Sequence, residues 1–215
     1  MSESESGTEL QALVRRATDL ADGPRRILGI AGPPGAGKST LAVYLAEHVG
    51  PRAMVVPMDG YHLADVELRR LGRAEYKGAP DTFDAGGFVA LLRRLREPSG
   101  EIVYAPGFER VIEQPIAGSI PVFPEINLVI TEGNYLLHDE GLWRGIRPQL
   151  DECWWIDLDG GPRRERLIER HVQFGKNRPA ARRWVEGSDE ANARTVSGGV
   201  ARADRVIRGD LPGLL

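Results

Sequence analysis

Hydrophobic residues recur every three or four positions in several segments of the chain, which is the period of an amphipathic helix. Leucine, valine and alanine follow this spacing between residues 10 and 20, and the segment closes at Asp22-Gly23-Pro24. Residues 41–49 repeat the pattern and end at Gly50-Pro51, an αL-tolerant glycine followed by a helix breaker. A further helix is expected to begin at Asp84, whose carboxylate can accept hydrogen bonds from the first N–H groups of the helix.

Short apolar runs of strand length lie between these segments. Continuous apolar runs are typical of strands buried on both faces, as in a parallel sheet covered by helices. The first run, Ile27 to Ala31, leads into a glycine-rich segment, and residues 188–203 are expected to form a helix that leads into the last run. The alternation of strands and helices predicts an α/β fold. The other expected strands are residues 53–58, 101–104, 126–131, 153–158 and 204–207.

Length and composition set the class of protein. The 215 residues fit one domain, 1–215, with an N-terminal helix within residues 1–23 and no repeat or composition break that requires a second domain. With 41% hydrophobic and 27% charged residues, the chain is expected to fold. No apolar run approaches the roughly 20 residues that span a bilayer, so no membrane is expected. A net charge of -3 gives no global basis for binding nucleic acid.

The first residues and the cysteine content favour a cytoplasmic protein. Residues 1–7 are acidic and serine-rich, and they lack the basic and then apolar order of a secretory signal. Cys153 is the single cysteine, so no internal disulfide can form, and its apolar neighbours predict a core residue rather than a nucleophile.

The segment from Gly32 to Ser39 matches the pattern G-x-x-x-x-G-K-[ST], and it lies between an expected strand and an expected helix. Roughly 0.003 matches are expected in a shuffled chain, which disfavours the alternative of a chance glycine-rich turn. In such a loop the backbone N–H groups surround phosphate oxygens, the lysine adds a positive charge and the hydroxyl can bind Mg²⁺. We therefore expect ATP and Mg²⁺ as cofactors. The expected nucleotide-binding residues are Gly32, Pro33, Pro34, Gly35, Ala36, Gly37, Lys38, Ser39 and Thr40.

Acidic residues directly follow two of the expected strands. Asp59 comes after the strand 53–58, and Glu132 comes after the strand 126–131. The carboxyl ends of parallel strands meet at the edge of the sheet where ligands bind. One carboxylate there can take the proton of an acceptor hydroxyl, and a second can hold Mg²⁺. The alternative is that each acid only forms a turn, because acidic residues are common in turns. One acid alone would not decide between the two interpretations, whereas two acids after neighbouring strands favour function.

Three further motifs follow the loop in order, and together they carry a resemblance. They are Met58-Asp59-Gly60-Tyr61-His62, Ala79-Pro80-Asp81-Thr82-Phe83-Asp84 and Ile130-Thr131-Glu132-Gly133-Asn134-Tyr135. From about residue 27 to residue 207 the chain resembles the phosphoribulokinase/uridine kinase family of P-loop kinases. It is similar to the bacterial nucleoside/nucleotide kinase-like branch, in which some members carry fructokinase labels, and more distantly to type I pantothenate kinases.

The resemblance implies a P-loop NTPase fold with a five-stranded parallel sheet, helices on both faces and a small helical lid at about residues 163–187. It implies Asp59 as the catalytic base and Glu132 as the acid near the metal. It also implies that Asp81 holds acceptor hydroxyls, although a turn residue after Pro80 is an equal alternative. Tyr61 and His62 are expected to line the acceptor pocket, or else to be structural groups beside a strand end.

Arginines gather in the segment that resembles the lid. Arg166 and Arg170 are four residues apart and can share one helix face, where Arg166 would contact the nucleotide and Arg170 would stabilise the transferred phosphoryl group. Arg163 and Arg164 are expected on a solvated face, with Glu165 and Glu169 as partners. The chain has 25 Arg and only 3 Lys, which favours point-charge roles for Lys38, Lys77 and Lys176, with Lys77 near the acceptor.

The sequence thus predicts an ATP-dependent kinase with a small-molecule hydroxyl acceptor. The strand before Glu132 lacks the aspartate of the common Walker B pattern, and residues 104–110 follow the uridine kinase pattern only loosely. Nucleosides, sugars and pantothenate-like alcohols therefore stay open as acceptors, and the oligomeric state stays open with a homodimer as one option. The alternatives are a GTPase switch, for which Asp157 to Gly160 matches D-x-x-G without an N-K-x-D motif, and a non-catalytic nucleotide-binding regulator.

Overall fold

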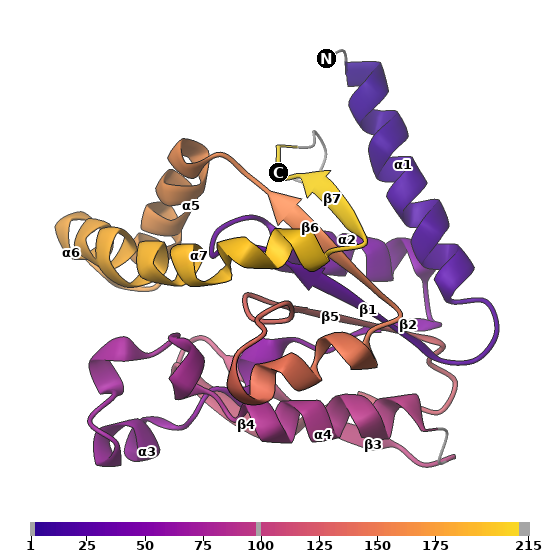
Figure 1. Ribbon diagram of the computed structural model, residues 1–215, viewed down its shortest axis with the longest axis horizontal. Helices are drawn as coiled ribbons and strands as arrows, with labels where there is room; N and C mark the ends of the chain where they lie inside the picture. Colours follow the sequence, from indigo (N-terminus) through magenta and orange to yellow (C-terminus); the bar gives the residue numbers. More distant parts are fainter. Residues whose placement is uncertain (1–2, 98–99, 211–215) are drawn as a thin grey trace.

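The fold is given by a computed structural model that describes residues 3–97 and 100–210 (Figure 1). The predicted domain also contains residues 1–2, 98–99 and 211–215, which lie outside the described residues. Within the described part of the chain, no helix combines the length and the apolar character needed to cross a membrane. The helices are α1 (Glu3–Leu20), α2 (Lys38–Val49), α3 (Asp65–Arg70), α4 (Ala85–Arg96), α5 (Gly160–Gln173), α6 (Arg178–Trp184) and α7 (Glu190–Val196). The strands are β1 (Arg26–Ala31), β2 (Ala53–Val55), β3 (Val103–Glu109), β4 (Gln114–Val122), β5 (Leu128–Gly133), β6 (Glu152–Asp157) and β7 (Arg205–Arg208).

The main sheet of the described residues has five strands in the order β2-β5-β1-β6-β7, and each pairing is parallel. The first strand along the chain is therefore central, with β5 and β6 on its two sides. This order brings the carboxyl ends of β1 and β5 together, because Ala31 pairs in register with Gly133. The predicted five-stranded parallel sheet is confirmed.

Side chains of the central strands alternate between two hydrophobic cores, as the period of two in a strand requires. Ile27, Val129 and Trp155 pack on the face covered by α4. Leu28 and Trp154 pack on the opposite face, which is covered by α1 and α2. The predicted cover of helices on both faces is confirmed, and the continuous apolar runs of β1, β5 and β6 are explained because these central strands are buried on both sides.

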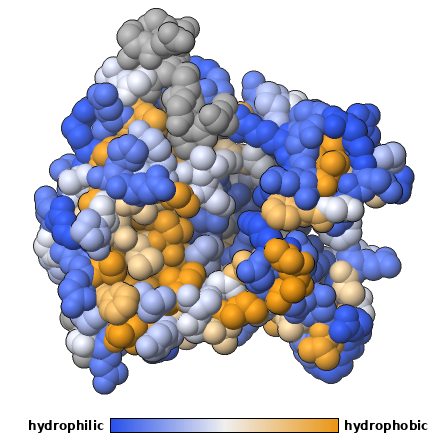
Figure 2. All heavy atoms as spheres, turned by 180° about the vertical axis from the view of Figure 1, so that it is seen from behind, coloured by the Kyte–Doolittle hydropathy of each residue, from blue (hydrophilic) through white to orange (hydrophobic). Residues whose placement is uncertain are grey.

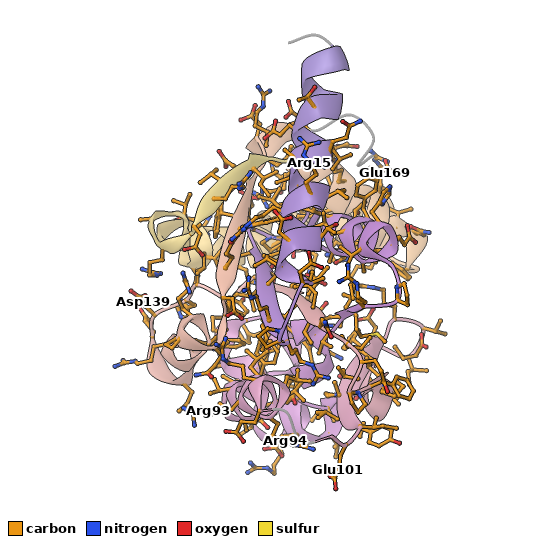
Figure 3. All side chains as sticks on the ribbon, turned by 90° about the vertical axis from the view of Figure 1, so that its right-hand side faces the viewer. Arg15, Arg93, Arg94, Glu101, Asp139 and Glu169 are labelled. Atoms are coloured by element: carbon orange, nitrogen blue, oxygen red, sulfur yellow. The ribbon has the colours of Figure 1, made fainter. Side chains whose placement is uncertain are left out.

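The outer surfaces of these covering helices are polar, as their sequences require. Arg93 and Arg94 project from α4 away from the sheet, while the leucines of the same helix enter the core (Figure 3). Asp84 caps this helix as predicted, because its Oδ1 accepts a hydrogen bond of 2.8 Å from the backbone N–H of Gly87.

Two predicted strands differ from the structure at their ends. The strand expected over residues 53–58 stops at Val55, and residues 58–61 form a 3-10 turn. Pro57 has no N–H to donate to a sheet, so the ladder cannot continue through it. Strand β5 instead runs on to Gly133, which places Glu132 inside the strand rather than after it.

The sequence prediction missed a two-stranded antiparallel ribbon formed by β3 and β4. Only residues 101–104 were expected to be extended in this region. The ribbon carries Pro106, Pro115 and Pro121, and much of β4 is exposed, so it lacks the apolar run that identifies a buried strand. A turn at residues 110–113 joins its strands.

A helical arm, here defined as residues 160–189, follows strand β6. It contains α5, α6 and a π-helical turn, Val185–Asp189, and it stands at the upper left in Figure 1. The arm has a small core of its own, made by Leu167, Ile168, Ala181 and Val185. It coincides with the segment that the resemblance assigned to a lid.

Candidate active site

The loop between β1 and α2 has the backbone shape of a phosphate cradle. Gly37 precedes the first residue of α2 with φ 98°, a left-handed conformation that favours glycine, and no neighbouring atom occupies the space where its Cβ would stand. Gly35 also has a positive φ, and a Cβ on it would lie 2.9 Å from the carbonyl oxygen of Arg163. The helix N-terminus behind the loop directs its N–H groups and positive dipole end at this space.

Lys38 is held beneath the cradle in a largely buried position. Its ammonium group donates to the Asn134 side chain at 2.6 Å and to the carbonyl of Pro33 at 2.9 Å. Burial lowers the pKa of Lys38 to about 8, although the nearby carboxylates Glu132 and Asp59 oppose the shift. Burial thus disfavours the charged form of Lys38, and an anion bound beside it would favour that form.

Ser39 and Glu132, the two residues that the sequence predicts as metal ligands, lie together at one corner of the loop. The Ser39 hydroxyl donates to Glu132 Oε1 at 2.8 Å, and Glu132 is only 6% exposed. Burial, and after it the negative charge of Asp59, raises the pKa of Glu132. A bound cation would oppose this shift by stabilising the ionised carboxylate. The described residues contain no cluster of three metal-ligating side chains. Mg²⁺ fits nonetheless, because it commonly takes one or two protein ligands and completes its shell with phosphates and water.

A pocket of about 970 Å³ opens from this corner. Seen from behind, the surface is hollowed between the helical arm at the upper right and the α3 region at the lower right (Figure 2). The predicted loop residues that line the pocket are Pro34, Gly35, Gly37, Lys38, Ser39 and Thr40. Gly32, Pro33 and Ala36 stand behind them: a Cβ on Gly32 would meet the backbone of β6, Pro33 supports Lys38 and Ala36 is buried.

The predicted acceptor residues divide into two groups. Asp59, His62 and Lys77 line the pocket with Glu132. The His62 ring donates to the backbone carbonyl of Asp59 at 2.8 Å, and burial lowers the pKa of His62, so the ring is a neutral wall. Lys77 donates to Asp65 at 2.6 Å.

Tyr61 and Asp81 are not brought to the pocket that the described residues form. The ring of Tyr61 turns under α4 and packs on Phe88, with ring centroids 5.2 Å apart. Asp81 lies in a 3-10 turn after Pro80, points to solvent and pairs with Arg73 at 2.8 Å. The structure thus supports the turn-residue alternative for Asp81 and the structural alternative for Tyr61.

The arm contributes Arg166 and Arg170 to the pocket on one helix face, as their spacing predicts. The expectation for Arg163 is wrong, because this residue is only 4% exposed. It donates to the carbonyl of Pro34 at 3.1 Å and to Glu190. A solvated face was expected for it together with Arg164, and only Arg164 is exposed. Glu165 and Glu169 pair with Arg178 rather than with these arginines.

The sequence assigned no individual role to several residues that line the pocket. On the arm and α7 they include His171, whose ring nitrogen lies 2.9 Å from Asp189 Oδ2, and the buried Asn192, which donates to the carbonyl of Gly78. On the ribbon they include Arg110 and Phe108. Sequence alone could have pointed to Asn134, which lies inside a quoted motif, whereas Asp189 reaches the pocket only through the π-helical turn.

Comparisons with known proteins agree with this site. Searched against models of known protein families, the sequence gives no match. It is 35% identical over 173 residues to the Schizosaccharomyces pombe protein "Putative uridine kinase C227.14", covering 76% of this chain and 74% of that protein. It is 33% identical over 162 residues to "ATP-dependent kinase-like protein notR'" of Aspergillus versicolor, covering 72% and 90%.

A solved structure from Silicibacter sp. TM1040, described as a "putative fructose transport system kinase", superposes with a TM-score of 0.84 at 36% identity. The match covers 92% of this chain and 98% of that one. The chain belongs to the phosphoribulokinase/uridine kinase family of P-loop kinases. Membership in this kinase family supports an ATP-dependent phosphotransferase and leaves the acceptor open.

Lys38→Met is expected to stabilise the nucleotide-free protein at pH 7 by about 1–3 kcal/mol, because it removes a buried charge. The unfolded chain keeps the lysine proton to about pH 10, whereas the folded chain loses it near pH 8. The stability of the parent protein should therefore rise relative to the variant between these two values. Urea unfolding at pH 7 and pH 9.5 with a chelator present measures the difference, and a less stable variant at pH 7 would contradict it.

Arg163→Met is expected to lower the free energy of unfolding by roughly 2–4 kcal/mol, because it leaves Glu190 and the Pro34 carbonyl without their buried donor. Arg164→Met is the matched control, since Arg164 also lies near Glu190, at 3.7 Å, but is exposed. The control should change stability by no more than about 0.5 kcal/mol. Equal effects of the two substitutions in urea unfolding would show that Arg163 is not the buried link.

Proposed function

We propose that the protein transfers the γ-phosphoryl group of ATP to a hydroxyl of a small molecule. The observation that carries this proposal is the placement of Asp59 beside the phosphate cradle. Asp59 lines the same pocket as Lys38 and Ser39, and its carboxylate influences both Lys38 and Glu132 electrostatically. A carboxylate at this position faces an acceptor hydroxyl rather than the base of a nucleotide.

Each residue of the corner has a distinct task in such a transfer. The cradle N–H groups and Lys38 bind the phosphate chain, and Lys38 is prepared for it because anionic oxygens would relieve its buried charge. Asp59 orients the acceptor hydroxyl and takes its proton as the oxygen attacks phosphorus. Ser39 and Glu132 would hold Mg²⁺, which when bound with ATP neutralises charge on the phosphate oxygens.

The arm supplies the closing side of the pocket. Arg170 lines it, and its positive charge lowers the pKa of Lys38, so the two cations act on the same space. Negative charge that develops on the transferred phosphoryl group would be stabilised by both Lys38 and Arg170. The arm also covers the pocket against water, which would otherwise compete with the acceptor hydroxyl.

A GTPase switch is less well supported. The D-x-x-G match begins at Asp157, the last residue of β6, and runs directly into α5. Asp157 is exposed and lies outside the set of described residues that line the pocket. One relative is named a uridine kinase and one solved structure a fructose transport system kinase, so the names support a kinase without choosing its acceptor.

Asp59→Asn is expected to reduce acceptor-dependent ADP release by about 10²–10⁴-fold, because the amide cannot take the hydroxyl proton. ATP should still raise the melting temperature, since the cradle is unchanged. The control Asp139→Asn removes an equal charge from an exposed side chain that pairs with Arg202 and does not line the pocket (Figure 3). Turnover near that of the parent protein would exclude Asp59 as the base.

Arg170→Ala is expected to lower kcat by at least about tenfold while the KM for ATP changes by less than about threefold, because its charge acts on the transferred group. Arg183→Ala, on the exposed side of α6, is the control for charge loss on the arm. Steady-state kinetics at saturating acceptor measure both constants. A rise in KM with kcat unchanged would instead assign Arg170 to ground-state binding of ATP.

A further inference from the structure

The turn of the β3–β4 ribbon places an arginine at the acceptor side of the pocket. Arg110 is the first residue of the turn 110–113 and lines the pocket. Its guanidinium nitrogen Nη2 lies 3.7 Å from Asp59 Oδ2, and its other contact is the ring of Phe174 on the arm, 5.9 Å from the ring centroid. Arg110 therefore stands between the proposed base and the end of α5.

This turn is held in place by contacts on both sides. Glu113 has φ 53°, a left-handed conformation that is rare for a residue with a side chain. Its carbonyl oxygen accepts a hydrogen bond from Lys77, whose ammonium group also donates to Asp65. The Gln114 side chain in turn accepts from the backbone N–H of Asp65 at 3.1 Å. The turn is thus fixed to the start of α3, and Arg110 is presented from a supported position.

The donors of Arg110 are unused by the part of the chain that the structure describes. The separation from Asp59 is too long for a hydrogen bond. A guanidinium group carries five N–H donors in a planar fork that matches the two oxygens of a carboxylate or phosphate. Arg69, on α3, also lines the pocket and makes no hydrogen bond or ion pair to the described residues. Two guanidinium groups therefore offer free donors to whatever occupies this side.

Among the described residues that line the pocket, seven arginine and lysine side chains face five aspartate and glutamate side chains, Glu113 on the ribbon turn among them, so positive charge is in excess. The charge of Asp65 is met by Lys77 at 2.6 Å, and Asp189 is bonded to His171 at 2.9 Å. Asp59 is needed for the acceptor hydroxyl. Within the described residues, Arg69 on α3 and Arg110 on the ribbon have no acid within hydrogen-bonding distance, and Lys176 on the arm stands over the Trp184 ring at 4.9 Å.

We propose that the acceptor carries an oxyanion, a carboxylate or a phosphate ester, which Arg110 binds, and that Arg69, which lines the same pocket, adds to the positive charge around it. This inference rests on the proposed kinase activity. Because Arg110 is only 3.7 Å from Asp59, the oxyanion and the reacting hydroxyl must lie within a few bonds of each other. The acceptor is therefore a compact hydroxy acid or a phosphorylated short polyol, rather than a neutral nucleoside.

The transfer remains balanced with such an acceptor. The hydroxyl oxygen forms a bond to the γ-phosphorus as the bond from that phosphorus to the bridging oxygen of ADP breaks. The hydroxyl proton passes to Asp59. The oxyanion takes no part in bond making, and its pairing with Arg110 draws the guanidinium from the carboxylate that must accept the proton. Arg110 thus selects and positions the acceptor.

The first test measures ADP release with matched pairs of acceptors, glycerol against glycerate and ribose against ribose 5-phosphate. We expect kcat/KM to be at least about tenfold higher for the anionic member of a pair than for its neutral member. Arg110→Gln should lower kcat/KM for the anionic member by about 10–100-fold and change it for the neutral member by less than about threefold. Arg70→Gln is the matched control, because Arg70 is an exposed arginine on α3 paired with Glu67. Equal or better use of the neutral members, unaffected by Arg110→Gln, would overturn the anionic acceptor and leave the kinase standing.

The second test does not need turnover. Inorganic phosphate is titrated calorimetrically into the protein with Mg²⁺ and a non-hydrolysable ATP analogue occupying the cradle. We expect saturable binding that Arg110→Gln weakens by at least about tenfold and Arg70→Gln leaves unchanged. No binding, or equal binding by Arg110→Gln, would overturn the oxyanion site. Arg110-dependent binding without ADP release from any acceptor would support the site and contradict the kinase activity.

Discussion

The geometry of the pocket depends on one buried guanidinium group. Arg163 lies in the first turn of α5, and it joins the Pro34 carbonyl of the phosphate loop to Glu190 at the start of α7. A buried charge is tolerated only where its hydrogen bonds are satisfied, so the three segments cannot separate without exposing or stranding it. The phosphate loop packs closely against α5 at Gly35, because the Arg163 carbonyl oxygen occupies the space that a side chain at position 35 would need. The side chains that the arm contributes to the pocket are therefore held in a fixed position relative to the phosphate loop.

A second constraint comes from the charges stored beneath the cradle. Lys38 and Glu132 are both buried, and burial shifts the pKa of each towards its neutral form. A protein selected only for stability would replace such groups with apolar ones. Their retention is understandable if phosphate oxygens and a cation complete the site. Asn134 fixes the ammonium group meanwhile, so the charge is already positioned before a ligand arrives.

The sequence was sufficient for the sheet and the cradle because both depend on local patterns. Continuous apolar runs identified the central strands, and the loop motif identified Lys38 and Ser39. Arg163 and Arg164 show where local patterns fail, since adjacent arginines on one helix differ in burial only through contacts with distant segments. Local patterns also fail for Asp81, because its pairing with Arg73 depends on how two turns are placed. They fail for the ribbon because its prolines and exposed side chains leave no apolar period.

The two sides of the pocket are built in different ways, the phosphate cradle from backbone groups and the acceptor side from side chains. The cradle is built from backbone N–H groups and one strand end, so it recognises a phosphate chain whatever the acceptor is. The acceptor side of the pocket is built from side chains on the ribbon turn, α3 and the arm. These segments lie outside the hydrogen-bonded strands of the central sheet. Substituting one of these side chains changes recognition without disturbing the cradle. Acceptor recognition can therefore change while the phosphate cradle is kept, and in this chain Arg110 stands on the wall where such a change would act.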